Sequence, residues 1–201
     1  MGEDRPVIGV LALQGAYTAH ARALTEAGAE PRLVKRPQEL GGLDGLIIPG
    51  GESTTFLWHL ERDGFFEALK DFVRETPTFG TCAGAILLAT GVENPPQASL
   101  KAMDMTVERN AYGRQVDSKI LSGPTTLPGG DLEMVFIRAP RISVVGPEVE
   151  VLASREGAPV LVRQGHLLAA TFHPELSGDG RVHRLFVESV KAHKALLARQ
   201  G

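Results

Sequence analysis

The sequence holds a single cysteine among its 201 residues, which excludes an internal disulfide. A chain without disulfides is typical of the reducing cytoplasm, and we expect a cytoplasmic location. Basic residues are not in excess either, because 21 lysines and arginines stand against 24 aspartates and glutamates, for a formal net charge of −3. Nucleic-acid-binding proteins typically carry a basic surplus. We therefore expect no nucleic-acid partner.

Long apolar segments are missing as well. No apolar run approaches the length that crosses a membrane, and no basic segment followed by an apolar core resembles a signal peptide. We therefore expect no membrane partner.

The chain shows no evident Walker-type phosphate loop or dinucleotide-binding fingerprint, so we expect no cofactor. Its length suits one domain over residues 1–201, since two domains of ordinary size need a longer chain.

The first half of the chain alternates short apolar runs with helical patterns. Residues 7–13 and 46–49 are apolar and rich in β-branched side chains, as is typical of parallel strands covered on both faces. We expect the first of these strands at the centre of the sheet. Helical patterns follow at 16–27 and 65–73. This alternation predicts a parallel sheet with helices on both faces.

The second half has a different pattern. Strands are predicted without clear helices between them at residues 103–107, 133–137, 149–152, 160–163 and 167–172. Gln164-Gly165 predicts a hairpin turn, and residues 181–199 predict a closing helix. We therefore expect one three-layer α/β domain whose mostly parallel sheet gains antiparallel strands in its C-terminal half.

The cysteine lies at a sharp turn between a predicted strand and a predicted helix. It stands in the run Phe79-Gly80-Thr81-Cys82-Ala83-Gly84, whose glycines permit strained backbone angles and close neighbours. The start of a helix also favours the thiolate, the reactive form of cysteine. The alternative for a lone cysteine is a small buried core residue. The G-x-C-x-G frame favours a nucleophile.

A cysteine nucleophile needs a general base, and the chain has six histidines. Four lie in predicted helices, where each could be an ordinary surface residue: His20, His59, His183 and His193. His166 falls in the hairpin turn, whereas His173 follows a predicted strand and is kept out of a helix by Pro174. In extended backbone Glu175 faces the same side as His173 and can orient its ring. An ion pair at a strand end is the alternative for His-Pro-Glu alone, and no third ligand points to a metal.

Together these residues resemble the class I glutamine amidotransferases, with Gly-Thr-Cys-Ala-Gly as the nucleophile turn and His-Pro-Glu as the rest of a triad. Further ordered motifs narrow the likeness to the glutaminase subunits of two-component pyridoxal 5′-phosphate synthases: Leu13-Gln14-Gly15 and residues 49–55, 107–118, 136–140 and 172–176. The likeness covers essentially the whole chain, although residues 101–103 depart from it and 118–132 match loosely. It implies the flavodoxin-like fold of that family.

The resemblance implies that the protein hydrolyses L-glutamine to glutamate and ammonia. Cys82 is then the nucleophile, His173 the general base and Glu175 the group that orients it. The backbone N–H groups of Gly51 and Ala83 are expected to stabilise the oxyanion of the tetrahedral intermediate.

The resemblance also implies a set of glutamine-binding residues: Gly51, Glu52, Ser53, Arg109, Ile137 and Arg138. Glu52 suits the α-ammonium group. Arg109 and Arg138 suit the α-carboxylate, because a guanidinium pairs with a carboxylate in a planar fork. Without the family context, a surface ion pair is the alternative for either arginine.

Ammonia released into water is mostly protonated and loses its nucleophilicity, which implies direct transfer to a partner. By resemblance this partner is the PdxS synthase subunit. One alternative is a glutaminase subunit of another synthase, such as that of histidine biosynthesis, and the segment 108–118 disfavours it. Another is a non-catalytic binding or regulatory protein that keeps a reactive cysteine.

Overall fold

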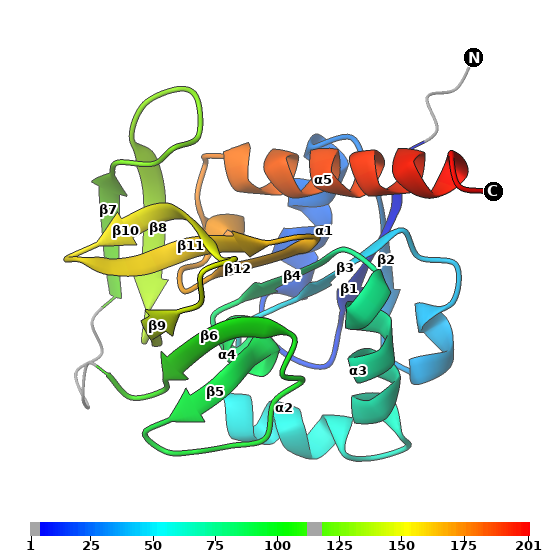
Figure 1. Ribbon diagram of the computed structural model, residues 1–201, viewed down its shortest axis with the longest axis horizontal. Coiled ribbons are helices and arrows are strands. Elements are labelled where there is room, and N and C mark those ends of the chain that lie inside the picture. Colours follow the sequence, from blue (N-terminus) through cyan, green and yellow to red (C-terminus); the bar gives the residue numbers. More distant parts are fainter. Residues whose placement is uncertain (1–4, 112–117) are drawn as a thin grey trace.

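The centre of the protein is a sheet of seven strands in the order β10-β11-β12-β4-β3-β1-β2 (Figure 1). It is seen in a computed structural model, which describes residues 5–111 and 118–201. The strand bounds are β1 (Val7–Leu11), β2 (Glu30–Val34), β3 (Gly45–Ile48), β4 (Thr78–Thr81), β10 (Glu150–Arg155), β11 (Ala158–Gln164) and β12 (Leu167–Ala170). The expected hairpin at Gln164-Gly165 is confirmed, because β11 and β12 pair antiparallel on either side of it.

The five strands from β12 to β2 are parallel, and β10 and β11 extend them antiparallel. This arrangement confirms the expected mixed, mostly parallel sheet. The expectation that the first strand is central is wrong, because β1 lies next to the edge strand β2. The strand is nonetheless buried, since helices cover both faces of the sheet there.

Helices form the two outer layers of the domain. Their bounds are α1 (Tyr17–Glu26), α2 (Ser53–Leu60), α3 (Phe65–Glu75), α4 (Ala83–Leu88) and α5 (Arg181–Ala198), with short 3₁₀ turns η1 (Pro37–Leu40) and η2 (Pro174–Leu176). The side chains of α1 and α5 pack with Ile8, Val10 and Ile47, whereas those of α2, α3 and α4 pack with Leu46 and Ile48. Alternate strand residues therefore serve opposite faces, as the two-residue period of a strand requires. No helix in the described part of the chain is long and apolar enough to span a membrane.

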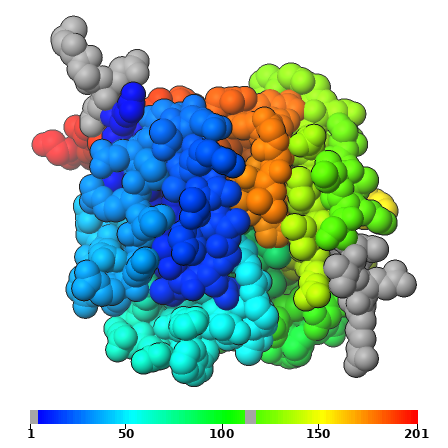
Figure 2. Space-filling model, turned by 180° about the vertical axis from the view of Figure 1, so that it is seen from behind, coloured from blue at the N-terminus to red at the C-terminus, as the bar shows by residue number. Residues whose placement is uncertain are grey.

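Two small sheets flank this core. One contains β5 (Ala89–Glu93), β6 (Met103–Glu108) and β9 (Arg141–Val145), and the other is the antiparallel pair β7 (Ser118–Gly123) and β8 (Leu132–Ile137). Leu132, Met134 and Phe136 of β8 are buried in the same apolar cluster as the side chains of α5. From behind, α1 in blue borders the orange segment that contains η2 and the start of α5 (Figure 2).

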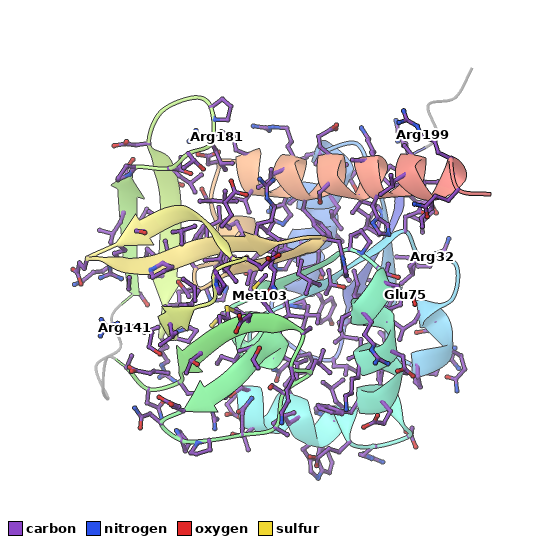
Figure 3. All side chains as sticks on the ribbon, in the orientation of Figure 1. Arg32, Glu75, Met103, Arg141, Arg181 and Arg199 are labelled. Carbon is purple, nitrogen blue, oxygen red and sulfur yellow. The ribbon has the colours of Figure 1, made fainter. Side chains whose placement is uncertain are left out.

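Side chains fill the space between these layers (Figure 3). Met103 of β6 lies within the apolar interior, whereas Arg32, Arg141 and Arg199 are exposed at the periphery of the molecule. This division is the ordinary one, because a charged side chain is costly to bury without partners. Glu175 departs from it with an exposure of 6%, and the reason lies at the candidate site.

Packing of α5 on the sheet predicts the first measurable effect. Phe186 is fully buried, and its ring centroid lies 5.6 Å from that of Phe79 on β4. Phe186→Ala should lower the free energy of unfolding by about 3–5 kcal/mol, because it leaves a cavity between helix and sheet. Chemical denaturation measures this loss. Leu196→Ala on the same helix is the control, since Leu196 is 53% exposed; equal losses would mean that Phe186 does not hold α5 to the sheet.

Candidate active site

Three adjacent parallel strands end at the same edge of the sheet. Ile48 at the end of β3 pairs with Gly80 of β4, and Thr81 at the end of β4 pairs with Ala170 at the end of β12. The carboxyl edge of a parallel α/β sheet is where such folds place their ligands and reactive groups. The chain leaving these strands therefore forms the candidate active site.

Each of the three strands delivers one part of the expected site. Gly50 and Gly51 follow β3, Cys82 follows β4, and His173 follows β12. The backbone N–H of Cys82 donates to the carbonyl of Ala170 at 2.9 Å, which ties the cysteine turn to β12. Residues that are far apart in the sequence thus meet because their strands are hydrogen-bonded neighbours.

The backbone at Cys82 is strained. Its φ of 52° and ψ of −109° place a side-chain-bearing residue in a region that few such residues adopt. A Cβ atom on Gly80 would overlap the backbone of Gly84, and one on Gly84 would overlap the carbonyl oxygen of Ile48. Both glycines are therefore needed for the close approach of strand and helix, as the sequence predicts.

His173 and Glu175 form a hydrogen-bonded pair. The Nδ1 of His173 lies 2.7 Å from Oε1 of Glu175, and both side chains are almost completely buried. The N–H of His173 donates to the carbonyl of Val135 on β8 at 2.8 Å, which fixes the backbone at this point. Since Glu175 is a carboxylate acceptor, Nδ1 carries a proton, so that the ring in its neutral form has its free lone pair on Nε2.

The imidazole of His173 adjoins Cys82 across Gly50. A Cβ atom built on Gly50 would lie 2.8 Å from Cε1 of His173 and 3.1 Å from Cβ of Cys82, so only glycine fits between them. Burial lowers the pKa of His173, but interactions with Cys82 and Glu175 outweigh it and raise the pKa to about 10. The surroundings therefore favour an imidazolium beside the sulfur. Gly50 belongs to the site, although the sequence motifs single out Gly51.

Glu52 caps α2 with its side chain. Its carboxylate accepts hydrogen bonds from the N–H of Thr54 at 3.0 Å and from the N–H and hydroxyl of Thr55, both at 2.7 Å. The hydroxyls of Ser53, Thr54 and Thr55 predict a hydroxyl cap for this helix, and that prediction is wrong, because the Glu52 carboxylate precedes the first helical residue and reaches the free N–H groups. The hydroxyl of Thr55 is the largest of the influences that bring the pKa of Glu52 to about 2, so this group is ionised.

The other expected glutamine-binding residues lie on elements that meet near this edge. Arg109 Nη2 donates to Thr54 Oγ1 at 2.9 Å, which puts the guanidinium at the first turn of α2. Ser53, the first residue of that helix, is buried. Ile137 ends β8, and the exposed Arg138 follows it with a φ of 45°. Their roles toward glutamine stay predictions. Residues 112–117 of the quoted segment 107–118 lie outside the described residues.

The two expected oxyanion donors differ in their surroundings. Ala83 is the first residue of α4, so its N–H has no acceptor within the helix. Gly51 has a φ of 135°, and a Cβ there would lie 2.6 Å from the amide nitrogen of Gln14. That amide donates to the carbonyl of Glu52 at 3.0 Å and so contacts the loop directly. The stabilising role of both donors stays a prediction.

Two histidines that the sequence patterns treat as surface residues are buried behind Glu175. His20 on α1 is 0% exposed and His183 on α5 is 1% exposed. His20 Nδ1 lies 2.9 Å from His183 Nε2, and His20 Nε2 lies 3.3 Å from Thr81 Oγ1 and 3.4 Å from Glu175 Oε2. The described residues contain no group of three metal-ligating side chains arranged to hold a metal ion. Hydrogen bonds join His20 to His183 and to Thr81, and Nε2 of His20 faces Glu175.

Helical spacing in the sequence indicates that both histidines lie on buried faces of their helices. His20 precedes the buried Leu24 by one turn, and His183 precedes the buried Phe186 by one turn. Burial lowers the pKa of His183 to about 4. Burial, with His183 and His173 nearby, also lowers the pKa of His20 well below its ordinary value. Both rings are therefore neutral near pH 7.

Comparison with known proteins gives a consistent result. The model of the SNO glutamine amidotransferase family matches residues 10–192. A relative from Koribacter versatilis, named pyridoxal 5′-phosphate synthase subunit PdxT, is 60% identical over 184 residues, which cover 92% of this chain and 95% of that protein. A protein of the same name from Mycobacteroides abscessus is 52% identical over 192 residues, covering 93% of this chain and 98% of that protein.

Solved structures agree with these relatives. A crystal structure of a glutamine amidotransferase matches with a TM-score of 0.84 and 45% identity, covering 92% of this chain and 98% of that one. A structure of PurLQS from Thermotoga maritima matches with a TM-score of 0.70 over 94% of this chain and 99% of that one. At 16% identity this second match shows the fold alone. The family resemblance of the sequence motifs is confirmed.

The buried His183 predicts a pH dependence of stability. The pKa of His183 is about 4 in the folded protein and about 6.5 when unfolded. Between pH 6.5 and pH 4 the unfolded chain therefore binds a proton at this residue that the folded protein does not. Stability is therefore lost as the pH falls from 6.5 toward 4. By pH 5 the part of this loss that is due to His183 should reach about 2 kcal/mol relative to pH 7, and His183→Gln should lack that part while it keeps the loss due to His20. Denaturant titrations from pH 7 to 5 measure the difference, and parallel profiles for the two proteins would contradict it.

Proposed function

Because the chain belongs to the SNO glutamine amidotransferase family, we propose that it is the glutaminase subunit of a pyridoxal 5′-phosphate synthase. It hydrolyses L-glutamine to L-glutamate and ammonia and passes the ammonia to the PdxS synthase subunit. The observation that carries the proposal is the hydrogen bond of 2.7 Å between His173 and Glu175, next to a cysteine held on a strained strand-to-helix turn. No metal or cofactor takes part in this proposal.

In the first half of the reaction Cys82 forms a covalent intermediate. The sulfur attacks the carbon of the glutamine side-chain amide, and His173 Nε2 holds the proton that leaves the thiol. The raised pKa of His173, about 10, supports this step because it favours the imidazolium beside the thiolate. The imidazolium then gives its proton to the departing nitrogen, so that ammonia leaves and a glutamyl thioester remains.

In the second half water replaces ammonia. His173, now neutral, takes a proton from the water that attacks the thioester carbon, and it returns this proton to the sulfur as glutamate leaves. Glu175 stays ionised throughout, holding the ring in the tautomer with a proton on Nδ1 and stabilising its positive charge. The developing oxyanion is stabilised by the N–H groups of Ala83 and Gly51.

Recognition of glutamine requires groups for both ends of the amino acid. Arg109 and Arg138 pair with the α-carboxylate, and the carboxylate of Glu52 accepts from the α-ammonium. Glu52 already accepts three hydrogen bonds from Thr54 and Thr55, yet two carboxylate oxygens offer about four acceptor sites. Capping and substrate binding are therefore compatible. Ser53 and Ile137 complete the proposed pocket.

Two alternatives are less well supported. A glutaminase subunit of histidine biosynthesis would share the chemistry, but relatives at 60% and 52% identity carry the name of the pyridoxal 5′-phosphate synthase subunit. A non-catalytic protein would have no use for a strained cysteine beside a buried histidine–carboxylate pair. Ammonia that escapes into water is mostly protonated, which supports direct transfer to a partner. A cytoplasmic location stays a prediction from the single cysteine.

The nucleophile is tested by removing its sulfur. Cys82→Ala should abolish glutamate release, by at least about 10³-fold, while leaving the fold and synthase binding intact. Steady-state glutamate assays with the synthase subunit present, together with a thermal melt, measure both effects. Turnover near the wild-type rate would rule out Cys82 as nucleophile, and a large drop in melting temperature would favour a structural cysteine.

The rest of the triad provides graded comparisons for the same assay. His173→Asn should be nearly as damaging as loss of the sulfur, and Glu175→Gln should be damaging but milder, since it orients the base without transferring protons. His166→Asn is the control, because His166 hydrogen-bonds to the carbonyl of Val73, away from the site. His183 is unsuitable as a control because it lies in the cluster behind Glu175.

The partner is expected to activate the enzyme. Gln14 contacts the loop that contains Gly51, so a synthase subunit bound at the Gln14-Gly15 turn would act on an oxyanion donor. Such donors act on the transition state, and addition of PdxS should therefore raise kcat more than it lowers KM. The measurement is glutamate release at saturating glutamine during a PdxS titration. A flat rate while complex formation is confirmed separately would exclude activation by the partner.

A further inference from the structure

The second oxygen of Glu175 lies against a buried histidine. Oε1 is held by His173, whereas Oε2 is buried and within the described part of the chain accepts no ordinary hydrogen bond. The polar atom that faces it is Nε2 of His20, at 3.4 Å. A buried carboxylate is costly unless donors meet both of its oxygens. The buried Oε2 of Glu175 therefore favours a proton on Nε2 of His20.

The carboxylate decides the tautomer of His20. If Nε2 were unprotonated, its lone pair would face the negative oxygen of Glu175 at 3.4 Å, and the two would repel. With the proton on Nε2, the ring donates toward Oε2 and also toward Thr81 Oγ1, which lies 3.3 Å away. Nδ1 is then an acceptor. Because burial keeps His20 neutral, it can carry only one of these two protons.

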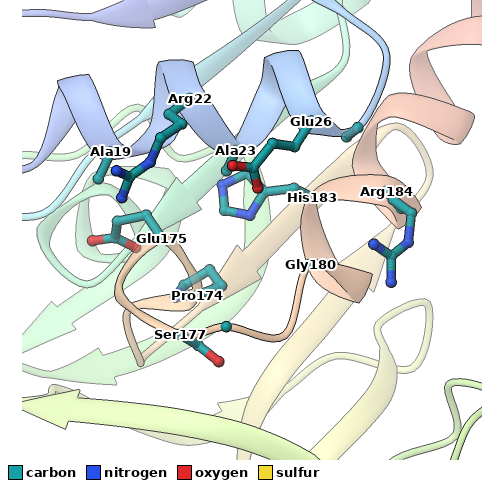
Figure 4. A pocket seen from close by; sticks show the side chains of 12 residues that line it. Ala19, Arg22, Ala23, Glu26, Pro174, Glu175, Ser177, Gly180, His183 and Arg184 are labelled. Atoms are coloured by element: carbon teal, nitrogen blue, oxygen red, sulfur yellow. The ribbon is translucent and has the colours of Figure 1, made fainter.

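His183 supports this tautomer from the other side. Its Nε2 lies 2.9 Å from Nδ1 of His20, within reach to donate to that nitrogen in this tautomer. Nδ1 of His183 is left as an acceptor without a partner among the described residues, and His183 lines a cavity of about 270 Å³ between α1 and η2. Figure 4 shows the ring of His183 in this cavity, and Arg22 and Glu26 of α1 line the same cavity. The cavity is large enough for water, which can donate to that nitrogen.

We propose that His20 is a positioning residue for the glutaminase reaction, whose Nε2–H holds Glu175 Oε2 and thereby keeps Oε1 turned toward His173. The triad then continues from His173 through Glu175 and His20 to His183, with hydrogen bonds at both ends and the 3.4 Å charge contact between Glu175 and His20 in the middle. Loss of the donor lets the carboxylate turn away from His173, whose orientation matters most in the transition state. This inference rests on the proposed function, because its readout is glutamine hydrolysis.

Two amide substitutions distinguish the role of Nε2 of His20 from the role of its Nδ1. The amide nitrogen of His20→Gln lies near the former Nε2 and can still donate to Glu175, whereas that of His20→Asn lies near the former Nδ1 and cannot. In the complex with the synthase, His20→Asn should lower kcat by about 10- to 100-fold with KM for glutamine nearly unchanged. His20→Gln should keep at least about a third of the wild-type kcat. A merely structural role would not distinguish them.

Coupling to Glu175 provides a second readout. In a Glu175→Gln background, His20→Asn should cost little more, because the carboxylate that it positions is already gone. His166→Asn is the matched control, since it removes a histidine hydrogen bond at the far end of β12 without contact to Glu175. Its kcat should stay near the wild-type value. Melting temperatures of all variants confirm that folded proteins are compared.

The possible outcomes distinguish a failure of the proposed function from a failure of the proposed role of His20. A wild-type complex that releases no glutamate would overturn the proposed function. A wild-type complex that is active, with His20→Asn equally active or with His20→Gln as impaired as His20→Asn, would overturn only the role of His20. Full additivity with Glu175→Gln would overturn it too. If His20→Asn does not fold, His20→Gln decides alone, and a tenfold loss of kcat in that folded variant would overturn the role.

Discussion

Hydrogen bonding between three neighbouring parallel strands, β3, β4 and β12, positions the glycine loop, the cysteine and the histidine–glutamate pair of the candidate active site. Their register aligns Ile48 with Gly80 and Thr81 with Ala170, so that all three strands end at one edge. The chain then turns immediately at each end, into the Gly50-Gly51 loop, the cysteine turn and the His-Pro-Glu segment. A shift of two residues in one strand would move its reactive group by about 6.6 Å, beyond hydrogen-bond reach of the others.

The site also requires that the backbones of neighbouring segments approach closely, because all three strands end at the same edge. The start of α4 lies against the end of β3, where a side chain on Gly84 would overlap the Ile48 carbonyl. Gly50 separates the histidine ring from the cysteine with no room for a methyl group. Backbone strain at Cys82 is tolerated because the sheet on one side and the buried helix on the other leave the turn no alternative.

Buried charge links the site to the rest of the fold. Glu175 lies in the interior, where an ionised carboxylate needs donors. His173 in its own segment supplies one, and Nε2 of His20 on a separate helix faces the other oxygen at 3.4 Å. The packing of α1 and α5 beside η2 therefore has two effects, because it covers the sheet and also places histidines near Glu175. It brings two neutral imidazoles to the side of the carboxylate that the histidine of the triad leaves free.

The sequence by itself determined the class of fold, the cysteine turn and the histidine–glutamate pair, because these depend on residues that are close together in the chain. It also determined the family, because the family's motifs follow one another in order along the chain. Periodicity predicts strands and helices, and glycine spacing predicts the turn. The two-residue repeat of extended backbone predicts the His173–Glu175 pair; the pair forms, but Glu175 lies in the 3₁₀ turn η2 and not in extended backbone. Only the tertiary structure decided that β1 lies next to the edge, that the carboxylate of Glu52 caps α2, and that His20 and His183 are buried. The two histidines are 163 residues apart, and local pattern does not reveal which polar side chain on a helix meets a partner from another layer. That choice is made when the layers pack, since a buried polar group is stable only where another element supplies its hydrogen bond.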